Sequence, residues 1–331
     1  MKQLNKHLRL PKNNFLFLVM LTFVFIVSSA LSISHQSLMI SSQPSVSGHK
    51  LSALKHQNSN IFPPLPVLGA STYYPILSAQ GVLAVDLNSG ISLYEKNADA
   101  PLLPASTTKI ITALVSLDAY PLDSILTAGR EVAVDGQKMG LYVGEQMRAE
   151  DLIKGLLIYS ANDAAQVLAA NYTGGYEAFI NAMNAKASEL SMTNSHFDNP
   201  VGLDGNGQRS TAHDLVLASE VAMRNPEFAK IVGTKETVVH DVTGRISYDL
   251  KNLNQLLGNT PGVLGIKTGW TESARENLVT YIDRDNHKIL IAILGSQDRF
   301  GETKELIDWI FNNYEWTEVV PQAVNTNFQS P

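Results

Sequence analysis

The segment GVLGIKTGWTESARENLVTYIDRDNHKILIAILGS, residues 262–296, carries the clearest structural pattern of the chain. It contains three strand-like runs rich in β-branched and aliphatic residues, which are GVLGIKTG, ENLVTYIDR and HKILIAILGS. A turn sequence, Asp283-Arg284-Asp285-Asn286, joins the second run to the third. Short connections of this kind join antiparallel neighbours, so the segment predicts part of a mainly antiparallel sheet.

Further elements extend this pattern toward both ends of the chain. Residues 81–97, GVLAVDLNSGISLYEKN, predict a hairpin around Asn88-Ser89-Gly90, and residues 236–242 and 244–250 predict two more strands. Residues 149 to about 225 are dominated by helical periodicity, and residues 300–314 predict a closing amphipathic helix. The expected fold class is α/β (α+β), one domain with a sheet assembled from both ends of the sequence.

The first seventy residues predict an export and attachment segment. A basic flank, residues 1–14, precedes an uncharged apolar run at 15–33 that predicts a transmembrane anchor or a signal peptide. Residues 34–70 lack periodicity and predict a disordered tether, followed by a domain at 71–316 and a tail at 317–331. We expect a cytoplasmic N-terminus and an extracytoplasmic domain at a bacterial membrane, or a secreted protein if residues 1–30 are removed.

Composition excludes several classes of function. The net charge of −6 provides no basic surface for a phosphate backbone, so nucleic acid is not an expected partner. The chain has no cysteine, which excludes disulfides, a thiol nucleophile and thiolate metal ligands. None of the eight histidines forms a metal-binding spacing, and we expect neither a metal nor a cofactor.

A serine followed three residues later by a lysine is the first candidate for chemistry. A lysine can activate a serine hydroxyl if desolvation or a nearby cation keeps its amine neutral. The spacing occurs at Ser106 and Lys109, but also at Ser47 and Ser52 within the predicted tether. Only Ser106 opens a predicted amphipathic helix, where Ser106-Thr107-Thr108 offers capping hydroxyls and residues three apart share a face. Ser106 is therefore the candidate nucleophile.

Two further motifs follow in the chain. Ser160-Ala161-Asn162 lies at a break between two predicted helices, where a helix cap is the structural alternative. Lys267-Thr268-Gly269 ends a predicted strand, and the small Gly269 would allow a substrate to approach the strand backbone. A solvated surface lysine is the alternative for Lys267.

The three motifs together are the signature of class A β-lactamases and penicillin-binding proteins. The segments PASTTKIITALVSLD, LLIYSANDAA, HFDNPVGLDGNGQRSTAHDL, IKTGWTESA and LGSQDRFGETKELIDWIF resemble the serine D-alanyl-D-alanine carboxypeptidases, the low-molecular-mass penicillin-binding proteins, from about residue 74 to 314. The resemblance implies a β-lactamase/transpeptidase-like fold with helices flanking the sheet and an α-rich subdomain that carries Ser-x-Asn.

The resemblance also implies roles for individual residues. Ser106 would form an acyl-enzyme with a peptidoglycan stem peptide ending in D-Ala-D-Ala, and Lys109 would accept its proton. Ser160 would relay a proton toward the leaving amine, and Asn162 would hold the Lys109 and substrate side of the network. Lys267 would tune the network electrostatically.

The same resemblance implies that Thr268 and Arg299 recognise the free carboxylate of the substrate. The planar guanidinium of Arg299 suits that task. A surface ion pair beside Asp298 and Glu302 is the alternative for Arg299. The oxyanion would be met by the backbone N–H groups of Ser106 and Trp270. β-Lactam antibiotics would act as covalent inhibitors.

The chain departs from the family pattern in one place that bears on substrate preference. Many relatives carry glycine where Arg275 stands, and often cysteine or another residue near Asn277. An arginine would add bulk and charge at a turn beside the site.

Three alternative functions stay open at this point. A D,D-endopeptidase acting on cross-links would use the same residues. A β-lactamase would need a carboxylate for the deacylating water, and Glu177 instead fits a solvated helix position. A non-catalytic cell-wall-binding protein with this fold would be expected to carry a broken motif, whereas all three motifs are intact.

Overall fold

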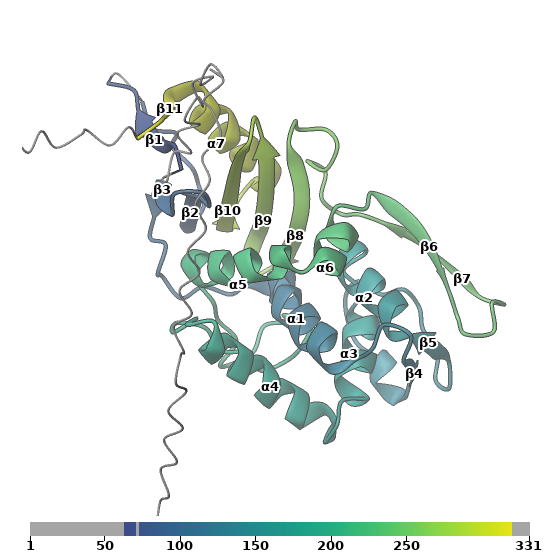
Figure 1. Cartoon of the computed structure of the whole chain (residues 1–331). Coiled ribbons are helices and arrows are strands. Elements are labelled where there is room, and N and C mark those ends of the chain that lie inside the picture. Colours follow the sequence, from purple (N-terminus) through teal and green to yellow (C-terminus); the bar gives the residue numbers. More distant parts are fainter. Residues whose placement is uncertain (1–62, 71–72, 320–331) are drawn as a thin grey trace, which may run out of the picture. The chain divides into compact units, whose positions relative to one another are not determined.

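The computed structural model describes residues 63–70 and 73–319, and its centre is a five-stranded antiparallel sheet. The strand order is β3 (Ile91–Lys96), β2 (Gly81–Asp86), β10 (His287–Ser296), β9 (Arg275–Arg284) and β8 (Val263–Thr271). The predicted runs at residues 81–97 and 262–296 therefore form this sheet, and its antiparallel pairing is confirmed. Strands β2 and β10, which are about 200 residues apart in the sequence, lie side by side in it (Figure 1).

Each face of the sheet is covered by a helix, because side chains alternate between faces along a strand. Helix α5 (Ala212–Arg224) packs on β2 and β10, and α7 (Arg299–Asn313) packs on β9 and β10. Along β10, Leu290, Ala292 and Leu294 join the core on the α5 side, whereas Ile289, Ile291 and Ile293 join the core with α7. The closing helix predicted at 300–314 is thus confirmed as α7.

The α-rich subdomain predicted between residues 149 and 225 is also confirmed. It comprises α2 (Ala149–Ile158), α3 (Asn162–Ala170) and α4 (Gly175–Glu189), which pack with α1 (Lys109–Ala119) below the sheet in Figure 1. The sequence did not predict α6 (Pro226–Val232), the 3₁₀ turn η2 (Arg130–Val132), or the pairing of β4 (Ile125–Thr127) with β5 (Gln146–Arg148). The strands predicted at 236–250 pair as β6 (Glu236–His240) and β7 (Ser247–Lys251) in a separate ribbon.

The predicted boundary between tether and domain is wrong at residue 70. Residues Leu65–Leu68 form β1, which pairs antiparallel with β11 (Tyr314–Thr317), with Leu65 opposite Thr317. A four-residue strand containing Pro66 has little local signal, and its partner lies about 250 residues away in the sequence, so the pattern reading could not identify it. The folded domain consequently includes residues that were assigned to the tether and the tail.

The basic flank, the apolar run at 15–33 and the tether up to residue 62 lie outside the described residues and remain predictions. Across 63–70 and 73–319, no helix has the length and apolar character needed to cross a bilayer.

Candidate active site

Ser106 lies in η1 (Ala105–Thr108), the 3₁₀ turn that leads directly into α1 at Lys109. The prediction that Ser106 stands near a helix start is confirmed, but the predicted capping is wrong. None of the hydroxyls caps a helix: Thr107 Oγ1 donates to the carbonyl of Pro104, and Thr108 Oγ1 accepts from Gln208. The Ser106 hydroxyl thus remains available, at the edge of a cleft of about 600 Å³.

Lys109 is fully buried, and its amine is held on two sides. Nζ lies 2.8 Å from Ser106 Oγ and donates a 2.7 Å hydrogen bond to the carbonyl oxygen of Val201. Burial, and secondarily the positive charge of Lys267, lower the pKa of Lys109 well below its ordinary value. The arrangement favours a neutral amine beside the serine, which is the condition for a lysine to act as a base.

Lys267, on β8, forms a second buried pair with Ser160. Its Nζ lies 2.8 Å from Ser160 Oγ and 3.1 Å from the carbonyl oxygen of Thr268. Burial, followed by the positive charge of Arg299, lowers the pKa of Lys267 to about 7. The role expected for Lys267 was electrostatic only, whereas the structure adds direct contact with Ser160. The alternative of a solvated Lys267 is wrong, because its exposed fraction is 2%.

Asn162 begins α3 and faces the cleft, but its contacts differ from those expected. Nδ2 donates to the carbonyl of Asp135 at 2.6 Å, and the backbone N–H donates to the carbonyl of Gln137 at 2.7 Å. No hydrogen bond to Lys109 is present among the described contacts, so the expected link is not formed here. Asn162 lines the cleft, but its Oδ1 is buried and has no hydrogen-bond partner.

Gly269 lies against the turn that carries the nucleophile. A Cβ atom at this position would lie 3.0 Å from the carbonyl oxygen of Pro104 and 3.1 Å from the backbone nitrogens of Ser106 and Thr107. Gly269 also lines the cleft, so the contact with this turn adds a second reason for glycine besides room for a substrate. Its missing side chain lets β8 approach η1, and the neighbouring Trp270, 61% exposed, lines the cleft beside it.

Arg299, at the start of α7, reaches the same cleft. Its Nη1 donates a 2.9 Å hydrogen bond to the carbonyl of Gly269, and its Nε is buried without a partner. No ion pair joins it to Asp298 or Glu302 within the described part of the chain, so the surface ion-pair alternative is wrong. Thr268 lines the cleft as well. Arg299 and Thr268 thus present donors at one end of the cleft.

Arg275 and Asn277 lie just beyond β8, and neither lines the cleft. Arg275 has φ of +60°, a left-handed conformation that glycine adopts without strain, which gives a physical reason for glycine at this position. Asn277 Nδ2 donates to the carbonyl of Leu103, and its Oδ1 accepts from the Gly295 N–H, so it links β9 to the segment before η1 and to β10. Glu177 is exposed in the first turn of α4, as expected for a solvated helix position.

Several groups at the site were missed by the sequence reading. Val201, Gly202 and Leu203 from the loop at 196–211, and Gly136 and Gln137 from the segment before β5, line the same cleft as Ser106. Their contribution is a carbonyl oxygen or a backbone position rather than a reactive side chain. The sequence marks such segments only as loops, so no residue type could have identified them.

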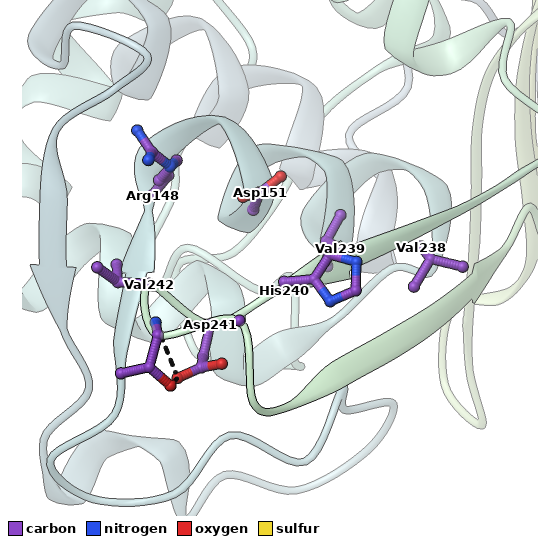
Figure 2. A pocket seen from close by; sticks show the side chains of 9 residues that line it. Arg148, Asp151, Val238, Val239, His240, Asp241 and Val242 are labelled. Atoms are coloured by element: carbon purple, nitrogen blue, oxygen red, sulfur yellow. Dashed lines mark hydrogen bonds between the residues drawn. The ribbon is translucent and has the colours of Figure 1, made fainter.

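A second hollow of about 490 Å³ lies beside the β6–β7 ribbon (Figure 2). One of the carboxylates that line it, Asp241, accepts hydrogen bonds from the backbone N–H groups of Thr243, Arg245 and Ile246. The carboxylate therefore closes the ribbon turn and contributes no chemistry. Elsewhere in the described residues, no group of three or more His, Cys, Asp or Glu side chains could hold a metal ion.

Comparison with known proteins gives consistent matches. A family described as D-alanyl-D-alanine carboxypeptidase matches residues 69–298. The chain is 31% identical over 246 residues to D-alanyl-D-alanine carboxypeptidase DacF of Bacillus subtilis, covering 72% of this chain and 63% of that protein. It is 36% identical over 242 residues to a D-alanyl-D-alanine carboxypeptidase of Mycobacterium tuberculosis, covering 70% of this chain and 82% of that protein.

Two further similarities concern the type of reaction. A D-alanyl-D-alanine endopeptidase of Pseudomonas aeruginosa is 33% identical over 243 residues, covering 71% of this chain and 77% of that protein. The crystal structure of the Streptomyces K15 DD-transpeptidase is similar with a TM-score of 0.69 and 31% identity, covering 73% of this chain and all of that one. The expected penicillin-binding-protein fold is confirmed by this similarity.

Proposed function

Because the chain belongs to the D-alanyl-D-alanine carboxypeptidase family, we propose that it removes the terminal D-alanine from peptidoglycan stem peptides through an acyl-enzyme on Ser106. The observation that carries this proposal is the buried pair in which Lys109 Nζ lies 2.8 Å from Ser106 Oγ. A buried lysine with a lowered pKa beside a serine at a cleft is an arrangement for nucleophilic catalysis, not for stability.

Acylation begins with proton transfer from Ser106 Oγ to neutral Lys109. The oxygen then attacks the carbonyl carbon of the penultimate D-alanine. Negative charge develops on the carbonyl oxygen, where the backbone N–H groups of Ser106 and Trp270 donate to it. The close approach of Gly269 to the Ser106 nitrogen supports this placement, because it brings the two backbones to the same edge of the cleft.

Departure of the terminal D-alanine requires a proton on its nitrogen. Ser160 supplies this proton from its hydroxyl and regains one from Lys267, whose Nζ is 2.8 Å away. A pKa near 7 suits Lys267 for giving and recovering a proton at neutral pH. Water then hydrolyses the acyl-enzyme, with the proton returned through the same two serine–lysine pairs.

The hydrogen-bond donors of Arg299 and Thr268 explain how the enzyme selects a substrate peptide that ends in a free carboxylate. The guanidinium of Arg299 and the hydroxyl of Thr268 bind the free carboxylate of the terminal D-alanine. Arg299 is partly buried, and its Nη1 is held by the carbonyl of Gly269, so the guanidinium is oriented before substrate binds. β-Lactams carry an equivalent carboxylate and would acylate the same serine.

A D,D-endopeptidase is the second candidate, supported by the similarity to the Pseudomonas aeruginosa endopeptidase. The residues of the cleft are compatible with either leaving group. A β-lactamase is disfavoured, because Glu177 lies exposed on α4 and does not line the cleft.

We also propose that residues 15–33 attach the enzyme to a bacterial membrane with the catalytic domain on the extracytoplasmic side. Lys2, Lys6, Arg9 and Lys12 before an uncharged apolar run support this orientation. Membrane fractionation of the full chain, with protease protection of the N-terminus, tests it. Release of the whole protein into the medium would contradict retention.

The proposed reaction is tested with a labelled penicillin and the purified protein. We expect covalent labelling that a Ser106→Ala variant loses and that a Ser52→Ala variant, which removes an equally spaced serine in the tether, retains. Incubation with a stem pentapeptide and with cross-linked dimers then separates the two candidates. Free D-alanine from the pentapeptide supports the carboxypeptidase, and cleavage of dimers alone would assign the endopeptidase.

A further inference from the structure

Asp163, the residue after Asn162, is a buried carboxylate that the mechanism does not use. Its exposed fraction is 0%, and it accepts four backbone hydrogen bonds. Oδ1 accepts from Met139 at 3.0 Å and from Ala164 at 3.0 Å, and Oδ2 accepts from Gly140 at 2.8 Å and Leu141 at 3.0 Å. One carboxylate therefore fixes three consecutive amides of the segment between η2 and β5.

The same segment encloses Asn162 a few residues earlier. The carbonyl of Asp135 accepts from Asn162 Nδ2, and the carbonyl of Gln137 accepts from its backbone N–H. Gly136 lies between them, where a Cβ atom would stand 2.7 Å from Asn162 Nδ2. Asp163 thus fixes one end of residues 135–141, and the other end holds the side chain of Asn162.

This clamp fixes the orientation of the Asn162 amide. A carbonyl oxygen can only accept, so the carbonyl of Asp135 selects the amide orientation in which Nδ2 faces the segment. The acceptor Oδ1 is then left without a protein partner. Gly136 and Gln137 line the cleft beside it, so a shift of the segment would move both the amide and the wall.

We propose that Asp163 is a positioning residue for acyl transfer, which acts by holding residues 135–141 so that the Asn162 amide stays in place at the wall of the cleft. This inference rests on the proposed acylation of Ser106. It assigns a function to a residue outside the three motifs, through contacts with backbone amides only.

A double-mutant cycle with Asn162 tests the inference. In Asp163→Asn, whichever way the amide is turned, two of the four N–H groups lose their acceptor. We expect the second-order rate constant for acylation of Ser106 by a labelled penicillin to fall about 30-fold, because misplacement by about 1 Å costs up to about 100-fold in rate. In an Asn162→Ala background the same change should alter the rate less than about 3-fold, because the group it positions is absent.

A matched control is Asp214→Asn. Asp214 is also buried in the first turn of a helix and accepts from a neighbouring loop, at the Asn194 N–H and the Ser195 hydroxyl. Both bonds end on Oδ2, which the amide oxygen of asparagine can replace, and Asp214 does not line the cleft, so we expect acylation to change less than about 3-fold. If Asp163→Asn is not folded by circular dichroism, Asp163→Ser, which keeps one acceptor oxygen, takes its place in the cycle.

The outcomes separate the inference from the function on which it rests. Equal fold-losses from the Asp163 change in both backgrounds, or no loss in the wild-type background, would overturn the positioning role. Absence of labelling in the wild-type protein would overturn the acylation proposal itself.

Discussion

Substitution of Gly202 by alanine should displace the turn that carries Ser106 and so lower the acylation rate. Gly202 follows Val201, whose carbonyl holds Lys109, and it packs against the turn that carries Ser106. A Cβ atom at Gly202 would lie 1.8 Å from the carbonyl oxygen of Ala105 and 2.4 Å from its carbonyl carbon. Since Cβ atoms do not approach other heavy atoms closer than about 3.0 Å, one of the two backbones must move by about 1.2 Å.

Two costs follow from this geometry. A displacement of this size between Lys109 and Ser106 should lower the acylation rate about 100-fold, which corresponds to about 2.7 kcal/mol of transition-state stabilisation. The φ of +84° at Gly202 adds about 1–2 kcal/mol of backbone strain for alanine. Together with the steric contact, we expect the free energy of unfolding to fall by about 2–4 kcal/mol.

The assay measures acylation by a labelled penicillin and urea denaturation of the same variants. Gly144→Ala is the matched control, because Gly144 has φ of +91° but nothing within 4 Å of a Cβ atom. It should lose about 1–2 kcal/mol of stability and retain its acylation rate. Acylation of Gly202→Ala at the wild-type rate would refute the inference that this contact holds the serine–lysine pair in place.

Four other predictions concern charge and strain. Lys267 has a pKa of about 7 in the folded protein, whereas in the unfolded chain it keeps its proton to about 10.5. The free energy of unfolding of the wild type relative to Lys267→Met should therefore rise between pH 7 and 9, by up to about 1.4 kcal/mol per pH unit. Parallel urea-denaturation profiles of the two proteins would contradict this. Arg299→Lys should reduce kcat/KM about 10- to 100-fold for peptides with a free C-terminal carboxylate but not for peptides with a C-terminal amide, because lysine cannot replace the oriented guanidinium. Equal losses for both substrates would argue against carboxylate binding by Arg299. Arg275→Gly should be more stable than Arg275→Ala by about 1 kcal/mol in thermal melts because only glycine is unstrained at φ of +60°, and the reverse order would show that strain is absent. Glu177→Gln should leave the deacylation rate unchanged, because the carboxylate is exposed on α4; slower release of the acyl group would give it a catalytic role.

The elements of the fold that could be predicted are those with a strong local pattern. The three runs within 262–296 are rich in β-branched and aliphatic residues over nine or ten positions, and the turn at Asp285-Asn286 has the left-handed φ values that its residues favour. β1 could not be predicted, because four residues with a proline gain their structure from β11 at the other end of the domain. Short strands depend on their partners more than on their own residues.

At the active site, the sequence predicted the reactive side chains but not the contacts and backbone groups that hold them in position. Ser106 and Lys109 share a face because they are three residues apart at a helix start, and that is a local property. The contact between Lys267 and Ser160 joins residues 107 positions apart, so only the tertiary fold that brings β8 beside the start of α3 creates it. The carbonyl of Val201 and the amides bound by Asp163 belong to the backbone, which every residue type carries, and sequence has no means to mark them.

The pairing of β2 with β10 sets the order in which the protein can acquire its structure. Asp86 lies opposite Ile289, so the middle of the sheet joins residues separated by 203 positions, and β10 is among the last elements to be synthesised. Closing so long a loop has an entropic cost before any sheet contact offsets it, which makes folding slow compared with that of a helical bundle. A chain that ends before residue 287 lacks the strand on which both α5 and α7 pack, and Lys267 then has no complete sheet to hold it near Ser160. Catalytic competence is therefore expected to arise late in folding, in one cooperative step, and not in a truncated chain that retains all three motifs.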